Sequence, residues 1–315
     1  MSDVRTAAIR HDEVPNRLRA LKRRTPRPVK AVARRAVRRY GAGTAERRVL
    51  PTFLVIGAKR GGTTSLWNAL LSHPGVLPMF PSAQQIKSPH YFDIFYANGL
   101  GWYKSHFPTA RAYARATQSL GYRPAVGEAS PYYLFHPAAP ERVARAVPGV
   151  KLIVLLRDPV SRAYSNYWER RGSQLEDLPT FREALAAEPG RLAGEEQRLV
   201  TDDRYYSVSH DSHSYRARGR YLEQLERWFQ HFDRDQFLVV ASEQFYAEPD
   251  AVSAQVQKFL GLQVQQISHI RHHNRLRVPP MDADLEHELR AYYDPYNQAL
   301  YERLGVDYGW PGASR

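Results

Sequence analysis

A glycine-rich loop that follows an apolar run constrains the fold of this chain more than any other feature. The run 51–56 (PTFLVI) leads into the segment 57–65 (GAKRGGTTS), and apolar residues recur at helical spacing over 66–70. A short apolar run that enters glycine predicts a buried strand, and the spacing after the loop predicts a helix. Such a strand, loop and helix directs the backbone N–H groups at the start of the helix toward an anion.

Two more apolar runs indicate the class of fold. Residues 151–156 (KLIVLL) and 236–241 (QFLVVA) each predict a buried strand, and helix-compatible sequence follows the first at 161–171. Residues 221–232 predict an amphipathic helix whose aromatic side chains belong to the core. Strands this apolar are typical of a parallel sheet that is covered on both faces. The alternation therefore predicts an α/β fold, a P-loop-like three-layer sandwich with a central parallel sheet.

The positive charge of the chain is concentrated before the first strand. Residues 1–49 hold 15 Lys and Arg against four Asp and Glu, and residues 50–315 hold 30 against 28. The first 49 residues thus carry +11 of the net charge of +13. We therefore expect a basic, flexible N-terminal tail (1–49) and one folded domain (50–315).

The tail leaves two interpretations open. Clustered bases gain from counterion release at a phosphate surface, so a membrane- or nucleic-acid-binding protein that acts through its tail is one alternative function. A solvated, partly helical leader is the other interpretation. Because the domain itself is nearly neutral, we expect peripheral contact of residues 1–49 with an anionic membrane rather than binding to specific nucleic acid.

Several classes of protein and site are excluded by what the sequence lacks. It contains no run of 18 apolar residues, which argues against a transmembrane helix. It contains no cysteine, which excludes disulfides, thiolate metal sites and cysteine nucleophiles. The paired histidines have no carboxylate at ligand spacing, so we expect no metal site.

The glycine loop departs from the ATP-binding pattern G-x-x-x-x-G-K-[ST] at one position. Thr63 stands where that pattern has lysine, and Lys59 lies four residues earlier. The run 151–156 ends in Arg157, and Asp158 comes only after it, whereas a magnesium site would have the aspartate alone. A P-loop nucleotide-dependent kinase is therefore the less favoured enzyme class.

Five motifs occur in a fixed order along the domain. They are GAKRGGTTS (57–65), KSPHYFD (87–93), GEASPYY (127–133), LRDPVSRAYS (156–165) and PYNQALYERLG (295–305). In these motifs the chain resembles the sulfotransferases that use 3′-phosphoadenosine 5′-phosphosulfate (PAPS), in particular the heparan-sulfate branch and its bacterial relatives. The resemblance makes 50–315 a sulfotransferase domain.

The resemblance implies transfer of a sulfuryl group from PAPS to a hydroxyl, or an amine, of a carbohydrate-containing or other small acceptor, without a metal ion. Lys59 would stabilise the charge that develops on the leaving adenosine bisphosphate. The implied donor-binding residues are Lys59, Arg60, Gly61, Gly62, Thr63, Thr64 and Ser65 in the loop, Arg157 and Ser165 at the 3′-phosphate, and Arg277, with Arg275 as second choice, in a C-terminal loop.

The identity of the general base is left open between two residues. Ser88 stands where the family has a glutamate, and Ala129 stands where a lysine is often found. With the glutamate absent, His90 is the first candidate for the base, and Asp93 would orient it or bind the acceptor. Glu128 is the rival candidate. Ser88, His90, Asp93 and Glu128 are together the expected acceptor-side residues.

The acceptor itself cannot be identified from the sequence. Residues 173–213 are rich in charge and lie where relatives vary with acceptor, so we expect either a lid or acceptor wall, or an ordinary solvated helix pair. Golgi relatives carry a membrane anchor that this sequence lacks, and arginine (38) far exceeds lysine (7). These features favour a cytoplasmic bacterial enzyme. Its basic tail could contact the inner face of the membrane.

Overall fold

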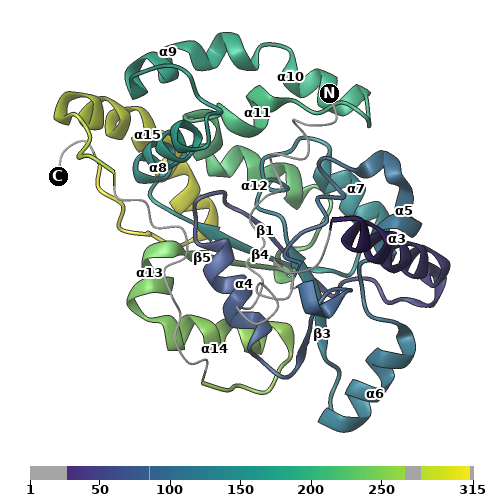
Figure 1. The fold of residues 1–315 in the computed structure, drawn as a ribbon. Coiled ribbons are helices and arrows are strands. Elements are labelled where there is room, and N and C mark those ends of the chain that lie inside the picture. The colour runs from purple at the N-terminus through teal and green to yellow at the C-terminus, as the bar shows by residue number, and fades with distance from the viewer. Residues whose placement is uncertain (1–26, 85, 267–277, 313–315) are drawn as a thin grey trace.

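The protein is built on a single five-stranded parallel sheet with strand order β2-β3-β1-β4-β5 (Figure 1). The structure, a computed structural model, describes residues 27–84, 86–266 and 278–312. The strands are β1 (Phe53–Gly57), β2 (Val76–Leu77), β3 (Ala125–Ala129), β4 (Lys151–Leu156) and β5 (Phe237–Ala241). In the centre of the sheet, Phe53 of β1 lies opposite Gly127 of β3 and Lys151 of β4.

Helices cover both faces of the sheet and one of its ends. The α-helices are α3 (Arg27–Gly43), α4 (Thr63–Leu71), α5 (Gly99–Lys104), α6 (Ala110–Leu120), α7 (Ala139–Ala146), α8 (Pro159–Gly172), α9 (Phe181–Leu192), α10 (Glu195–Thr201), α11 (Val208–Ser212), α12 (Tyr221–Phe229), α13 (Ser242–Ala247), α14 (Pro249–Leu260) and α15 (Ala283–Leu304). Short 3₁₀ turns are η1 (Ala45–Arg47), η2 (Ser82–Gln84), η3 (Tyr96–Asn98), η4 (Ala217–Gly219) and η5 (Arg234–Gln236). Within the described residues, none of these helices has the length and apolar character that a membrane span requires.

Alternate side chains of the strands point into two separate cores. Phe53 and Val55 of β1 pack with α4, α13 and α14, whereas Leu54 and Ile56 pack with α7, α12 and the C-terminal part of α15. This is the three-layer arrangement that the apolar strands predict. Trp228 of α12 is fully buried, which confirms its place in the core. The α/β class and the central parallel sheet are therefore confirmed.

A third apolar cluster joins the helices that follow β4. It is formed by α8, α9 and the first half of α15, and its centre contains Tyr167, Phe181 and Tyr293. These helices, with α10 and α11, form the upper part of the view in Figure 1. Helix α9 begins with a capping box, in which the side chains of Thr180 and Glu183 each accept a hydrogen bond from the other residue's backbone N–H group.

Most of the segment before β1 is helical where the structure describes it. Helix α3 occupies Arg27–Gly43, and the ring of Tyr40 contacts that of Phe80. The guanidinium of Arg48 is buried, donates a hydrogen bond to the carbonyl of Phe107 and lies over the Phe80 ring. Residues 40–48 thus contact the domain, and the division of the chain at residue 49 remains a prediction.

Two strands were not expected from the sequence. Strand β3 carries Gly127 and Glu128 at its centre, so it does not form a continuous apolar run. Strand β2 spans only two residues, which is too short for any pattern. Both strands are recognisable only through their pairing: Val76 lies opposite Ala125, and Leu77 lies opposite Val126.

Candidate active site

The glycine loop is pressed against the neighbouring strand. A Cβ atom added to Gly61 would lie 2.4 Å from the backbone oxygen of Leu155 in β4, so only glycine fits there. Gly62 has a φ of 91° and caps α4, a conformation that glycine adopts at little cost. The loop therefore lies at the end of β1 with the first N–H groups of α4 directed toward the carboxyl edge of the sheet, and it forms a cradle suited to a phosphate.

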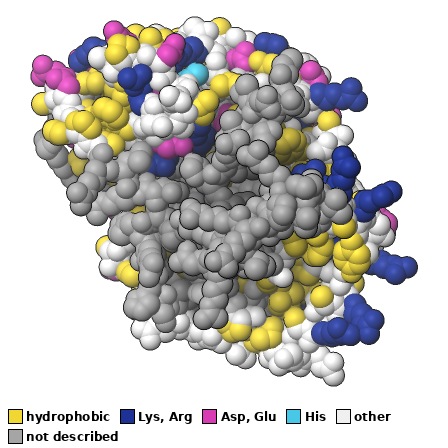
Figure 2. Space-filling model, viewed as in Figure 1, with side chains coloured by type: hydrophobic (Ala, Val, Ile, Leu, Met, Phe, Trp, Pro, Cys, Tyr) yellow, Lys and Arg dark blue, Asp and Glu magenta, His cyan; other side chains and the backbone are white. Residues whose placement is uncertain are grey.

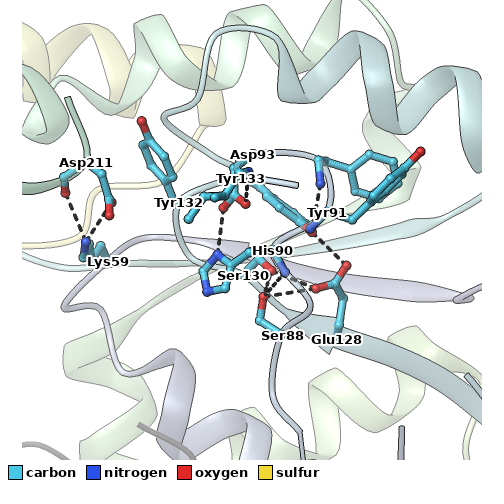
Figure 3. Close-up of polar contacts among 12 residues, drawn as sticks. Lys59, Ser88, His90, Tyr91, Asp93, Glu128, Ser130, Tyr132, Tyr133 and Asp211 are labelled. Atoms are coloured by element: carbon cyan, nitrogen blue, oxygen red, sulfur yellow. Dashed lines mark hydrogen bonds and ion pairs between the residues drawn. The ribbon is translucent and has the colours of Figure 1, made fainter. Parts of the chain in front are cut away.

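Lys59 on this loop forms an ion pair with a helix that is distant in sequence. Its Nζ lies 2.8 Å from Oδ1 of Asp211 and 3.0 Å from the backbone oxygen of the same residue (Figure 3). Asp211 belongs to the short helix α11. The pairing is a feature that the sequence analysis did not anticipate.

The surroundings of Lys59 disfavour its charge. Burial lowers the pKa of Lys59, and the nearby guanidinium groups of Arg170 and Arg218 lower it further, whereas Asp211 raises it. For Asp211 the balance is the reverse. Burial opposes its ionisation, but Lys59, Arg218 and Arg170 hold the pKa of its carboxyl well below the ordinary range.

A second lysine reaches the phosphate loop. Lys87 Nζ lies 3.1 Å from the Thr63 hydroxyl and 2.9 Å from the Thr64 hydroxyl. Its backbone oxygen accepts a hydrogen bond from Ala129 at the end of β3, which fixes it beside the loop. Lys87 is the first residue of the KSPHYFD motif, but no role for it was expected from the sequence.

The residues assigned to a 3′-phosphate lie together at the end of β4. Arg157 Nη1 donates to the backbone oxygen of Arg60 at 3.3 Å, and Arg60 Nε donates to the hydroxyl of Ser165 at 3.1 Å. Asp158 accepts hydrogen bonds from the backbone of Val160 and from Ser161, and thereby caps α8.

Ser65 is the remaining donor-binding candidate of the glycine loop. Ser65 is buried in the first turn of α4, and its hydroxyl lies 3.0 Å from that of Tyr246. Arg275 and Arg277 lie outside the described residues. In the described part of the chain, no group of three acidic or histidine side chains is arranged to hold a metal ion.

His90 and Asp93 form a pair on the other side of the site. His90 Nδ1 lies 3.0 Å from Asp93 Oδ2, and the Asp93 side chain is fully buried. Burial alone would lower the pKa of His90, but the Asp93 carboxylate, with smaller contributions from Asp211 and Glu128, raises it above the ordinary value. Because Asp93 occupies Nδ1, the other ring nitrogen, Nε2, is the one placed to exchange a proton with an acceptor.

Glu128 lies in a closed polar cluster behind His90. Its carboxylate accepts hydrogen bonds from Tyr103 at 2.7 Å, Tyr133 at 3.0 Å and Ser130 at 2.7 Å. Ser88 lies against Ser130, is 3.4 Å from the carboxylate, and accepts a hydrogen bond from the backbone N–H of His90 (Figure 3).

Burial decides the protonation of Glu128. The residue has no exposed surface, and burial raises the pKa of its carboxyl to about 7 even though three hydroxyl hydrogen bonds lower it. The structure thus brings together all four acceptor-side residues expected from the sequence. Of the hydroxyl partners of Glu128, Ser130 and Tyr133 belong to the GEASPYY motif, whereas Tyr103 comes from α5 and lies outside the five motifs.

Comparison with known proteins points to a single family. The sequence profile of the sulfotransferase domain matches residues 50–287. Human heparan sulfate glucosamine 3-O-sulfotransferase 3A1 is 30% identical over 287 residues, which cover 84% of this chain and 63% of that protein. The membrane-associated sulfotransferase kil1 of Dictyostelium discoideum is 25% identical over 327 residues, which cover 83% of this chain and 66% of that protein. The chain thus spans less than two thirds of the length of both relatives.

A solved structure extends the comparison to the fold. The crystal structure of a sulfotransferase from Alicyclobacillus acidocaldarius is 30% identical to this chain and superposes with a TM-score of 0.60. The superposition covers 82% of this chain and 97% of that one.

Replacement of Glu128 by glutamine should remove a pH dependence of stability. Because the folded-state pKa is raised from 4.5 to about 7, the folded chain keeps a proton on Glu128 in a pH range where the unfolded chain has released it. The free energy of unfolding therefore falls as the pH rises through this range, by up to about 3 kcal/mol. We therefore compare the free energies of unfolding of Glu128→Gln and the wild type by denaturant titration at two pH values. The difference between the two proteins should shift in favour of Glu128→Gln when the pH is raised from 5 to 8.

The matched control is Glu248→Gln, which changes an exposed glutamate. It should show the same difference between the two pH values as the wild type. Equal effects of Glu128→Gln at pH 5 and pH 8 would contradict the raised pKa.

Proposed function

Because the chain belongs to the sulfotransferase family, we propose that it transfers a sulfuryl group from PAPS to a hydroxyl, or an amine, of a carbohydrate-containing or other small acceptor. The observation that carries this proposal is that a candidate donor site and a candidate acceptor site lie next to each other at one edge of the sheet. A glycine cradle with Lys59 and Lys87 lies on the donor side, and the His90–Asp93 pair lies on the acceptor side. The human relative named above acts on heparan sulfate glucosamine, which supports a glycan acceptor.

The proposed reaction is an in-line displacement at sulfur. The acceptor oxygen or nitrogen forms a bond to sulfur while the bond from sulfur to the phosphate oxygen breaks. The acceptor proton passes to Nε2 of His90, and the Lys59 ammonium stabilises the negative charge on the leaving phosphate oxygen. Positioning and charge stabilisation account for most of the rate in transfers of this kind.

Donor recognition has a cradle that fits phosphate groups. The backbone of Gly61–Gly62 and the hydroxyls of Thr63 and Thr64 would hold the 5′-phosphate, and Arg157 with Ser165 would hold the 3′-phosphate. Lys87 lies on the two threonine hydroxyls and would add a second cation at the 5′-phosphate.

The donor assignment is tested by calorimetry with 3′-phosphoadenosine 5′-phosphate. We expect binding without magnesium, and much weaker binding of ATP. Arg157→Ala should weaken the bisphosphate by about 2–3 kcal/mol, the scale of a charge-assisted contact. It should barely change the affinity for adenosine 5′-phosphosulfate, which has no 3′-phosphate.

Arg171→Ala, on helix α8 shortly after Arg157, serves as the control, because the Arg171 guanidinium donates to the backbone oxygens of Glu176 and Asp177 instead of to the glycine loop. It should leave both affinities unchanged. Equal affinity for ATP, or a strict magnesium requirement, would overturn the donor assignment. A uniform loss for both ligands in Arg157→Ala would assign this residue a folding role.

The proposed base is His90, with Asp93 as its orienting partner and Glu128 as the rival. His90→Gln should cut turnover about 10²–10⁴-fold and leave bisphosphate binding intact. A histidine base must be neutral, and Asp93 raises its pKa, so activity should fall as the pH drops below a midpoint above 6.5. Asp93→Asn should move this midpoint to lower pH. These profiles come from steady-state kinetics once an acceptor has been found by mass spectrometry.

The kinetic comparison with Glu128→Gln separates the two bases. If His90→Gln keeps nearly full turnover and Glu128→Gln abolishes it, Glu128 is the base. If turnover falls in both variants but only His90→Gln removes the acidic limb of the pH profile, His90 is the base and Glu128 supports it through Ser88.

We further propose a cytoplasmic bacterial enzyme whose residues 1–49 contact an anionic membrane surface peripherally. The high arginine content supports the first part. For the second, α3 contains no acidic residue, and its Arg35, Arg38 and Arg39 are exposed. Figure 2 shows Lys and Arg side chains along the edge of the molecule on which Figure 1 draws α3 and α6. Each such residue contributes about 1 kcal/mol near an anionic bilayer.

Vesicle sedimentation tests this contact. The full chain should bind vesicles that contain phosphatidylserine, and binding should weaken with salt. The triple variant Arg35→Gln, Arg38→Gln, Arg39→Gln should bind at least tenfold more weakly, since three charges are lost.

The control triple variant Arg182→Gln, Arg198→Gln, Arg303→Gln changes the net charge equally at other exposed positions. It should bind like the wild type. Equal weakening by both triple variants, or tighter binding to duplex DNA than to the vesicles, would contradict the proposed membrane contact.

A further inference from the structure

The Lys59 ammonium group is held by one residue through two atoms. An ammonium has three N–H donors. In the part of the chain that the structure describes, Oδ1 and the backbone oxygen of Asp211 lie at 2.8 and 3.0 Å from Nζ and take up two of them. This arrangement fixes the direction of the third donor, and the Lys59 side chain retains 16% of its surface exposed for a ligand.

Asp211 is itself held rigidly. Its other carboxylate oxygen, Oδ2, accepts a hydrogen bond from the Tyr206 hydroxyl at 3.0 Å. The Arg218 guanidinium donates to its backbone oxygen at 3.1 Å and lies 3.7 Å from Oδ1. Helix α11 is fixed at its start by Ser207, whose hydroxyl accepts the N–H of His210. The carboxylate is therefore in place before any ligand arrives.

We propose that Asp211 is a positioning residue for the sulfuryl transfer proposed above, which it serves by keeping the Lys59 ammonium charged and by directing its remaining N–H toward the leaving oxygen. The inference rests on the proposed function, since it assigns Asp211 a role in that reaction. It also involves the stretch 173–213, which contains α11 and for which the sequence left a lid or acceptor wall and an ordinary solvated helix pair open.

Electrostatics gives the reason that such a residue is needed. The charged groups that face Lys59 are Arg170 and Glu169 from α8, Arg218 from η4 and Asp211 from α11. Burial and the two guanidinium groups favour the neutral amine. Asp211 is the carboxylate in direct contact with Nζ, so its removal should lower the pKa of Lys59 further. A neutral amine could not stabilise charge on the leaving oxygen.

The charge on Lys59 can be followed without any donor or acceptor. The chain has only seven lysines, so [ε-¹³C]lysine-labelled protein should give a resolvable NMR titration, with Lys59 assigned by its absence in Lys59→Arg. In Asp211→Asn the Lys59 signal should titrate at least about one pH unit lower than in the wild type. In the control variant Asp203→Asn, which breaks an ion pair with Arg142 elsewhere, it should titrate as in the wild type.

Kinetics then tests the positioning role. Lys59 must be cationic to act, so activity falls as the pH rises through its pKa, and Asp211→Asn should move this alkaline limb to lower pH. A misdirected ammonium should also lower kcat/KM about 10²-fold on the plateau. Asp203→Asn should do neither. A rate loss in Asp211→Asn with an unmoved limb would reduce Asp211 to a structural residue and overturn the inference.

Asp211→Asn leaves Arg218 buried beside a neutral side chain, so this variant could fail to fold. A second variant, Asp211→Glu, keeps the proposal testable in that case. Asp211→Glu keeps the charge but displaces the carboxylate by one methylene. Its Lys59 titration should match the wild type while kcat falls about tenfold. An unchanged kcat would overturn the positioning role.

The two proposals can fail separately. If the wild type does not bind 3′-phosphoadenosine 5′-phosphate, the proposed function fails whatever the NMR titration gives. If it binds, but Lys59 titrates at the same pH in the wild type and in Asp211→Asn, the role of Asp211 fails and the donor assignment stands.

Discussion

The parallel direction of the five strands places every strand's carboxyl end at one edge of the sheet, and the candidate site depends on this constraint. Both faces of the sheet are closed by apolar packing, so polar side chains can gather only where the strands end. The contact of Gly61 with the backbone of β4 holds the phosphate loop at that edge. Arg157 follows β4, and Glu128 lies in β3 directly after its central residue, Gly127. Chain segments far apart in sequence therefore meet without any long-range motif that pairs them.

Charge is distributed unevenly within this edge. The donor side carries lysines and arginines, and its buried carboxylate, Asp211, is ionised because cations surround it. The acceptor side carries Glu128, whose burial among tyrosine and serine hydroxyls raises its pKa to about 7. The pKa values of two buried carboxylates in one site are thus shifted in opposite directions. The difference follows from their neighbours, because aspartate and glutamate have similar ordinary pKa values.

Ser88, which stands where the family has a glutamate, lies next to a carboxylate from another part of the chain. The Ser88 hydroxyl lies between the backbone of His90 and the carboxylate of Glu128. A carboxylate from β3 thus approaches the place that the resemblance assigns to a glutamate at position 88. His90, held by Asp93 at Nδ1, keeps Nε2 for the acceptor, so the two candidate bases belong to one connected polar cluster.

The sequence by itself determined the strands β1, β4 and β5 and the glycine loop, because these are local patterns of hydrophobicity and turn geometry. The candidate site residues from Lys59 to Ser165 came from the resemblance of the five motifs to a family. The sequence did not reveal β2 or β3, because a two-residue strand and a strand with Gly127 and Glu128 at its centre have no such pattern. Only the tertiary structure decided that Asp211 contacts Lys59 and that Lys87 covers the loop threonines. The physical reason is that an ion pair depends on distance in space, and 152 positions separate Lys59 from Asp211 along the chain.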